Sequence, residues 1–471
     1  MNLIFMLSVC FKGIGAVLEI VTQVILTRYT GLEGYGTYTT WINFADLLFW
    51  CFFSGIVKCN TFYLSGGGKR FSRFRKRYYI RYAGPVLLVI AIAAAAAGEL
   101  SYAIVPLVAL LELRVYDKSS SLLAEGRYVP SLLGEYILGR AVMLGGIVLL
   151  EAAGKMSLSR LLILYVIQYL AVIIYFSFHV LGKQFRKTDQ PENKVRCQTI
   201  REISDQVSLR KWWEYQRGDI IQSLVGQVPV ILQYFFAGAL EAGVIAVVLL
   251  VKKLINFISG PTSKVFLPEF SKLYHAGEKD KLRECFASIM KVQLLFVSPL
   301  AVVLLGYPKI ILGILASELI PYTNLFMMCS AVFLLAAMLG PCGGLLQMTE
   351  NEKKDNRCRE ISIVLMFLVF VLYRDHPLFA VYGLSIQTLT ESVSKYVLVC
   401  KWLGKPPVSV GTFISWWVIP ALAILAAVIL KSQTSFWMMA VMAGGTFLIQ
   451  LYHEFRHQNL KEILDGRRKK E

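Results

Sequence analysis

Long apolar stretches separated by short polar segments recur along the whole chain. A helix needs about 20 apolar residues to cross about 30 Å of hydrocarbon. Stretches such as 86–97 and 421–430 are continuously apolar rather than alternating. Backbone groups in the bilayer core must bond within a helix or a closed barrel, so this pattern favours helices. The sequence therefore predicts an all-α integral membrane protein of about fourteen transmembrane helices.

The predicted spans form two sets of six and a final pair. The first set is 3–27, 36–58, 79–98, 102–123, 131–150 and 159–181. The second set is 214–237, 241–262, 284–305, 319–346, 357–373 and 378–400. The final pair is 411–430 and 434–452.

Composition supports a membrane protein. The chain has 471 residues, of which 56% are hydrophobic and only 17% are charged, whereas soluble domains carry roughly 25% charged residues. The first apolar stretch contains Lys12 and Glu19 and has no small-residue cleavage site, so we do not expect a cleaved signal peptide. The nine cysteines form no C-x-x-C pair, and we expect no metal site and no cofactor.

Basic residues gather in every second connecting segment. The rich segments are 59–78, 182–213, 263–283, 347–356 and the tail after residue 452, while the alternate segments hold only single basic residues. The positive-inside rule places the rich segments in the cytoplasm. We therefore expect a multi-pass protein of the cell (plasma) membrane with both termini cytoplasmic. The net charge of +18 is divided among these segments, which argues against nucleic-acid binding.

Two similar glycine turns suggest an internal repeat. The segment 31–36 reads Gly-Leu-Glu-Gly-Tyr-Gly, and 238–243 reads Gly-Ala-Leu-Glu-Ala-Gly. Ser54-Gly55 has a counterpart in Ser259-Gly260. The offset is six helices, an even number, so both copies would share one orientation, as in transporters built from parallel repeats.

The repeat divides the chain into four segments. We expect an N-terminal lobe over 1–181, a basic cytoplasmic linker over 182–213 and a C-terminal lobe over 214–400. Two extra helices and a basic tail would follow over 401–471.

Ionisable side chains inside the predicted spans are the candidate functional residues. A charge at the centre of a span costs about 2.5–3.5 kcal/mol on insertion scales, so it usually faces a cavity or a partner. We expect Arg217, Lys395 and Lys118 to reach the interface or to form ion pairs. The candidates for a polar, mostly cationic cavity between the lobes are Lys12, Glu19, Asp46, Arg114, Lys252, Lys253 and Glu391.

In these features the chain resembles the polysaccharide (O-antigen type) flippases of the multidrug/oligosaccharidyl-lipid/polysaccharide exporter superfamily. The resemblance lies in segment 26–38, in Ser54-Gly55 and the basic segment after it, in 238–243, and in Leu267-Pro268-Glu269-Phe270. It implies two six-helix lobes around a central cavity, often with two further C-terminal helices. Lys12 stands where related flippases place a cation on their first helix.

The resemblance also implies a function in surface polysaccharide biosynthesis. Relatives flip an isoprenoid-diphosphate-linked oligosaccharide from the cytoplasmic to the outer leaflet. Lys12, Arg114 and Lys252 could bind the diphosphate, and Trp41, Trp50 and Tyr38 could contact sugar rings. The expected partners are the lipid-linked oligosaccharide, membrane lipids and a polysaccharide polymerase complex, and Glu19, Asp46 or Glu391 could couple a proton or a sodium ion.

Three other function classes fit the sequence less well. The segment 65–70 lacks the frame of a phosphate-binding loop, so we expect no ATPase. A polysaccharide polymerase would need a large external loop, but the longest expected one, 306–318, is short. A drug or cation antiporter of the same superfamily is the nearest alternative, although cationic substrates would favour an acidic cavity. We expect a transporter with no catalytic residues.

Overall fold

The computed structural model describes residues 3–55, 84–85, 87–89, 92, 100–124, 127–184, 209–430 and 435–456. Helices are the only regular secondary structure in these ranges. The chain therefore has the all-α fold expected of an integral membrane protein. Most of the predicted span 79–98 and of the basic segments 59–78 and 182–213 lies outside the described residues.

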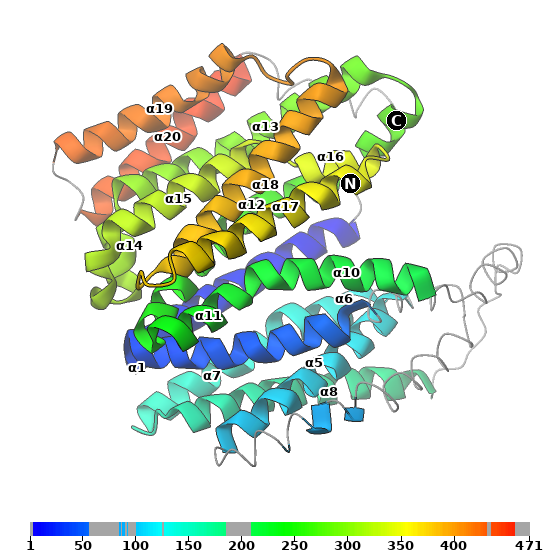
Figure 1. Ribbon diagram of the computed structural model, residues 1–471, viewed down its shortest axis with the longest axis vertical. Helices are drawn as coiled ribbons and strands as arrows, with labels where there is room; N and C mark the ends of the chain where they lie inside the picture. Colours follow the sequence, from blue (N-terminus) through cyan, green and yellow to red (C-terminus); the bar gives the residue numbers. More distant parts are fainter. Residues whose placement is uncertain are drawn as a thin grey trace, which may run out of the picture. The chain divides into compact units, whose positions relative to one another are not determined.

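Two compact units make up the chain, Met1–Ala246 and Val247–Glu471. The first unit contains α1 (Leu3–Phe52), α5 (Leu100–Ala124), α6 (Tyr128–Leu132), η2 (Leu133–Leu138), α7 (Gly139–Ala152), α8 (Leu158–Gln184), α10 (Leu209–Gly226) and α11 (Val228–Ala237). Within this unit α1 packs against α5, α7, α10 and α11, and α5 packs against α8 (Figure 1). The lobe limits at residues 181 and 214 stay a prediction.

The second unit begins inside α12 (Ala239–His275). It continues with α13 (Lys279–Ala301), η3 (Val302–Gly306), α14 (Pro308–Leu315), η4 (Ser317–Tyr322), α15 (Thr323–Met338), α16 (Cys342–Met348), α17 (Glu352–Leu372), α18 (Phe379–Leu403), α19 (Val410–Ile429) and α20 (Phe436–Arg456). Within the second unit α17 packs along α18, and α18 also packs against α15 and α16 (Figure 1).

Seven stretches of the described helices are long and apolar enough to cross a membrane, judged by length and composition. They are Cys10–Phe52, Tyr128–Ala152, Leu158–His179, Gln216–Ala237, Lys279–Gly306, Ser317–Met348 and Gly411–Ile429. Other predicted spans are helical too and carry charged side chains, among them α12, α17 and α18. These charge-bearing helices contribute to the candidate site of the second unit.

Two predicted loops are wrong. The segment 263–283 is largely helical, because α12 continues to His275 and α13 begins at Lys279. With 37 residues at 1.5 Å per residue, α12 is about 56 Å long and exceeds the bilayer core, so hydropathy missed its polar end. The segment 306–318 contains the short helix α14, which is too short to be recognised as a span.

The two glycine turns of the repeat share one backbone conformation. Gly31 has φ 70° and ψ 173°, and Gly238 has a φ of 118° and a ψ of 177°. This region of backbone space is essentially accessible only to glycine. Gly31 bends α1 between the first two predicted spans, and Gly238 separates α11 from α12. The structure thus aligns Gly31 with Gly238 and Gly36 with Gly243, one residue away from the Leu-Glu alignment of the sequence.

Candidate functional site

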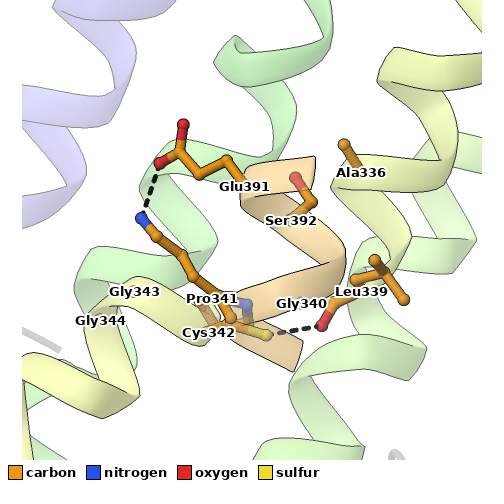
Figure 2. A pocket seen from close by; sticks show the side chains of 10 residues that line it. Ala336, Leu339, Gly340, Pro341, Cys342, Gly343, Gly344, Glu391 and Ser392 are labelled. Atoms are coloured by element: carbon orange, nitrogen blue, oxygen red, sulfur yellow. Dashed lines mark hydrogen bonds and ion pairs between the residues drawn. The ribbon is translucent and has the colours of Figure 1, made fainter. Parts of the chain in front are cut away.

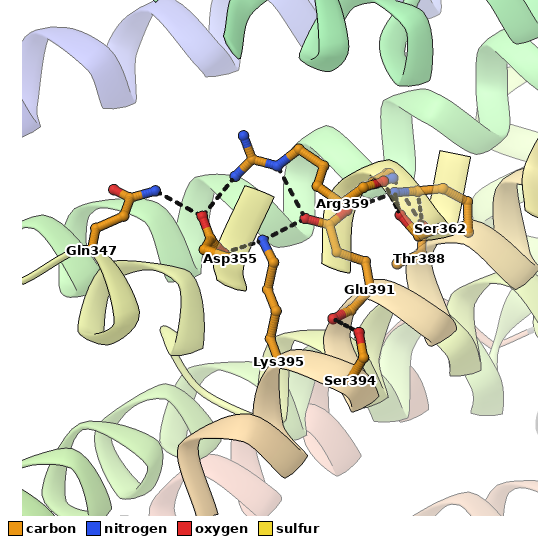
Figure 3. Close-up of polar contacts among 10 residues, drawn as sticks. Gln347, Asp355, Arg359, Ser362, Thr388, Glu391, Ser394 and Lys395 are labelled. Carbon is orange, nitrogen blue, oxygen red and sulfur yellow. Dashed lines mark hydrogen bonds and ion pairs between the residues drawn. The ribbon is translucent and has the colours of Figure 1, made fainter. Parts of the chain in front are cut away.

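An ionic network joins α17 and α18 in the second unit (Figure 3). Asp355 and Arg359 are four residues apart on α17, and Glu391 and Lys395 have the same spacing on α18, so each pair shares a helix face. The Lys395 Nζ atom lies 2.7 Å from Glu391 Oε1 and 2.8 Å from Asp355 Oδ1. Arg359 approaches the same two carboxylates, at 3.4 Å from Asp355 Oδ2 and 3.5 Å from Glu391 Oε1.

Burial of these charged side chains costs hydration free energy. The Asp355 side chain is 0% exposed and that of Lys395 is 8% exposed. Buried charges lose several kcal/mol of hydration each, and only close opposite charges and hydrogen bonds offset the loss. Two carboxylates and two cations balance formally, and each carboxylate contacts both cations. Of the two outcomes expected for Lys395 from the sequence, the structure shows ion pairs.

A chain of polar contacts extends this network to Lys252 on α12. Glu391 Oε2 accepts a hydrogen bond from Gln387 Nε2 at 2.6 Å. The Thr388 hydroxyl donates to Gln387 Oε1 at 3.2 Å and accepts from Lys252 Nζ at 2.9 Å. Lys252 also lies 5.5 Å from the centroid of the Phe333 ring, a cation–π contact. Among the described residues no carboxylate contacts Lys252 directly, so the network carries one formal positive charge in excess.

At its other end the network borders a cavity. Gln347 of α16 donates to Asp355 Oδ2 at 3.0 Å. A cavity of about 220 Å³ lies between the α15–α16 break and α18, with Glu391, Ser392 and Lys395 in its lining (Figure 2).

A second polar cluster lies in the first unit, around Tyr136. Arg140 Nη2 is 3.0 Å from Glu19 Oε2, and Lys12 Nζ lies 5.4 Å from the centroid of the Tyr136 ring. Tyr136 belongs to the π-helix η2, a local widening of the helix that is frequent at functional sites. A β-carbon at Gly15 would lie 3.1 Å from both the Arg140 guanidinium and the Tyr136 side chain, so glycine allows this close approach. Lys12 and Glu19 thus face the same helix pair.

Asp46 and Glu112 lie in a third polar region, where α1, α5 and α8 meet. Glu112 is 4% exposed, and its buried Oε2 atom has no hydrogen-bond partner. Asp46 follows Ala45 on α1, and Ala45 packs with Val105 and Val108 of α5. Tyr165 and Tyr169 of α8 pack against the apolar cluster around Ala45 that adjoins the two carboxyls.

The other predicted residues lie elsewhere. Arg114 and Lys253 are exposed. Tyr38 is only 4% exposed and packs edge-on against Tyr165 at 6.2 Å, which argues against a sugar contact for its ring. The structure thus brings together Lys252 and Glu391 in one network and Lys12 and Glu19 in another.

Sequence reasoning missed Asp355 and Arg359. The predicted loop 347–356 covered Asp355, and the next span was expected to begin at residue 357. A signal was present, because Asp355/Arg359 and Glu391/Lys395 are matched acid–base pairs on consecutive helices.

Comparisons with solved structures identify the fold. The structure of the lipid II flippase MurJ in an inward closed conformation has a TM-score of 0.63 and 12% identity, covering 97% of this chain and 99% of that chain. An inward-facing multidrug resistance MATE family transporter of the MOP superfamily has a TM-score of 0.61 and 11% identity, with coverage of 83% and 94%. An outward-facing structure of this kind has a TM-score of 0.53 and 13% identity, with coverage of 85% and 95%.

Sequence comparison adds no relatives, since no protein-family model and no curated protein matches the chain. The chain therefore has the all-α membrane fold shared by MurJ and the MATE structures.

Proposed function

We propose that this protein flips an isoprenoid-diphosphate-linked oligosaccharide from the cytoplasmic to the outer leaflet of the plasma membrane by alternating access. The fold supports this proposal, because the similarity to the lipid II flippase structure extends over 97% of this chain. The solved MATE structures include inward-facing and outward-facing conformations. Both termini would lie in the cytoplasm, as the basic segments predict.

The observation that carries the proposal is the excess positive charge of the α12–α17–α18 network. Among the described residues, Lys252, Arg359 and Lys395 face two carboxylates, and Lys252 contacts a hydroxyl and an aromatic ring. A diphosphate cannot enter hydrocarbon without replacing its hydration shell. An ammonium group replaces it with charge-assisted hydrogen bonds, which are roughly twice as strong as neutral ones. Lys252 is therefore our candidate for contact with the diphosphate.

Carboxyl groups of the first unit would couple transport to the movement of an ion. Of the three carboxylates predicted for this role, Glu19 pairs with Arg140 and Glu391 pairs with Lys395. Asp46 and Glu112 lie in one polar region, and the buried Glu112 Oε2 atom has no hydrogen-bond partner, so we propose these two carboxyls as the site where a proton or sodium ion is exchanged. An inside-negative potential would also assist outward movement of an anion, by about 2.3 kcal/mol per charge per 100 mV.

Flipping can be tested with the purified protein in proteoliposomes that contain a fluorescent lipid-linked oligosaccharide. Accessibility of the fluorophore to an external quencher measures translocation. We expect wild type and Lys309→Met to translocate, since Lys309 is exposed on α14, and Lys252→Met to lose at least tenfold in rate. Equal rates for Lys252→Met and wild type would exclude Lys252 from the diphosphate site, and no translocation by wild type would reject the flippase.

One observation favours a cation antiporter as the second candidate. Asp46 and Glu112 are both acidic and Glu112 is buried, as a site for a cationic substrate would be. Proton-driven uptake of a fluorescent cation into the same proteoliposomes, abolished by Asp46→Asn, would support this alternative over the flippase.

A further inference from the structure

The cavity beside the α17–α18 network is bounded by a glycine-rich helix break. The chain leaves α15 at Met338 and enters α16 at Cys342, and Gly340 between them has a φ of 80°. The lining includes Gly340, Gly343, Gly344, Glu391, Ser392 and Lys395 (Figure 2). A β-carbon at Gly343 would lie 3.3 Å from Asp355 Oδ1 and 3.5 Å from Lys395 Nζ. Glycine at this position therefore brings the backbone close to the charged groups.

The charges around the cavity select against an anion. Glu391 and Lys395 are the charged side chains among its lining residues, and they cancel formally. Asp355 forms an ion pair with Lys395 and adds a negative charge, and Arg359, which also contacts Asp355, compensates for this charge. A phosphate would gain no net attraction here and would approach two carboxylates. A neutral ligand would avoid this repulsion.

Hydrogen-bonding capacity remains in the lining. An ammonium group has three N–H donors, and each carboxylate oxygen accepts about two hydrogen bonds. Two of the three N–H donors of Lys395 bond to Glu391 and Asp355, so one N–H donor remains for a ligand. Glu391 Oε2 accepts one hydrogen bond, from Gln387. Asp355 Oδ1 contacts Lys395 Nζ at 2.8 Å and has the capacity for a second hydrogen bond. The Ser392 hydroxyl adds a donor and an acceptor to the lining. Closely spaced donors and acceptors match the hydroxyl groups of a sugar.

The volume of the cavity limits the size of the ligand that it can hold. Pockets for drug-sized ligands have volumes of roughly 300–1,000 Å³, whereas this one measures about 220 Å³. A cavity smaller than a drug-sized pocket suits one sugar ring rather than an oligosaccharide.

We propose that this cavity binds a single neutral, hydroxyl-rich sugar ring and so contributes to selection of the transported glycan. The assignment of the ring to the cargo rests on the proposed flippase function, whereas binding of the ring itself does not. The α15–α16 turn would form one wall, and the α18 residues Glu391, Ser392 and Lys395 would supply the polar contacts.

The test measures sugar binding to the full-length protein in lipid nanodiscs by saturation-transfer NMR. Glucose, galactose and N-acetylglucosamine serve as neutral probes, with inorganic diphosphate as the anionic competitor. We expect at least one sugar to bind, diphosphate not to displace it, and Ser392→Leu to abolish binding by filling the cavity. Ser394→Leu is the matched control, because Ser394 lies on the same helix outside the lining.

A milder variant covers the case in which Ser392→Leu does not fold. Ser392→Ala removes one neutral hydrogen bond and should weaken sugar binding about fivefold. Absence of binding by every probe, unchanged binding by both Ser392 variants, or displacement by diphosphate would each overturn the proposal. Sugar binding without lipid flipping would reject the proposed function alone, and flipping without sugar binding would reject this inference alone.

Discussion

Gly36 and Gly243 make reciprocal contacts between the two repeated turns of the first unit. A β-carbon on Gly36 would overlap the carbonyl oxygen of Ala239, and one on Gly243 would overlap the carbonyl oxygen of Leu32. Leu32 follows Gly31 directly, just as Ala239 follows Gly238. The contact is therefore the same from either side, and each turn needs a glycine because the partner is backbone that cannot rotate away.

Replacing either glycine with alanine should destabilise the protein. Overpacking of this kind typically costs about 1–3 kcal/mol, and we expect Gly36→Ala and Gly243→Ala to lower the midpoint of thermal unfolding in detergent. Gly145→Ala is the control, because a β-carbon there meets no atom within 4 Å. Wild-type midpoints for both variants would show that the two turns are not held together as described.

The Lys395 ion pairs should behave as a coupled set. Lys395→Met leaves the fully buried Asp355 carboxylate with the longer Arg359 contact and the hydrogen bond from Gln347, and breaking a buried pair typically costs about 3–5 kcal/mol. Adding Asp355→Asn removes the stranded charge, so the double variant should be more stable than the sum of the single effects predicts. Lys281→Met serves as the control, since its pair with Glu278 is exposed. Additive effects in the double-mutant cycle would contradict direct coupling.

Glu112→Gln should preserve or raise stability. The buried Oε2 atom of Glu112 has no hydrogen-bond partner, and no cation pairs with Glu112 among the described residues. A neutral amide of similar shape removes the cost of burying a charge near Asp46. Thermal unfolding at neutral pH should therefore give an unchanged or higher midpoint, while Glu112→Lys should lower it. A large loss in the glutamine variant would mean that the carboxylate has a stabilising partner.

Gln216 should be a strong determinant of the first unit's stability. Its Nε2 atom donates to the carbonyl oxygens of Trp50 and Cys51 at 2.6 and 2.7 Å, and its Oε1 atom accepts from the Gly55 amide at 2.9 Å. Gln216→Leu keeps the size of the side chain but removes these three hydrogen bonds, which should cost about 1–3 kcal/mol. Gln222→Leu on the same helix is the exposed control. Equal unfolding midpoints for the two variants would contradict this role.

The ion pair between Glu19 and Arg140 should tolerate exchange of its charges. Each side chain keeps nearly a third of its surface exposed, so water can reach both groups. Glu19→Gln alone should reduce stability less than Lys395→Met does, and the exchanged variant Glu19→Arg/Arg140→Glu should recover part of the loss. A more severe defect in the exchanged variant would indicate that Arg140 acts through its contact with Tyr136 instead.

The sequence predicted helix existence well and helix ends poorly. Apolar length alone indicated the spans that became α8, α13 and α19, because burial in hydrocarbon demands a continuous apolar helix. The same criterion missed the polar extension of α12 and the short α14, because helices outside hydrocarbon need no apolar run. It also could not find the helix breaks at Gln227 and at 339–341, which depend on local backbone geometry.

By itself, the sequence determined the all-α membrane architecture, the paired glycine turns and the presence of many charges within apolar helices. Only the tertiary structure decided which charges meet. Lys252 and Glu391 are 139 positions apart, and their connection through Thr388 and Gln387 depends on how α12 and α18 are placed. Hydropathy is a property of each segment, whereas charge pairing depends on distance and orientation between helices, which spacing along one helix cannot specify.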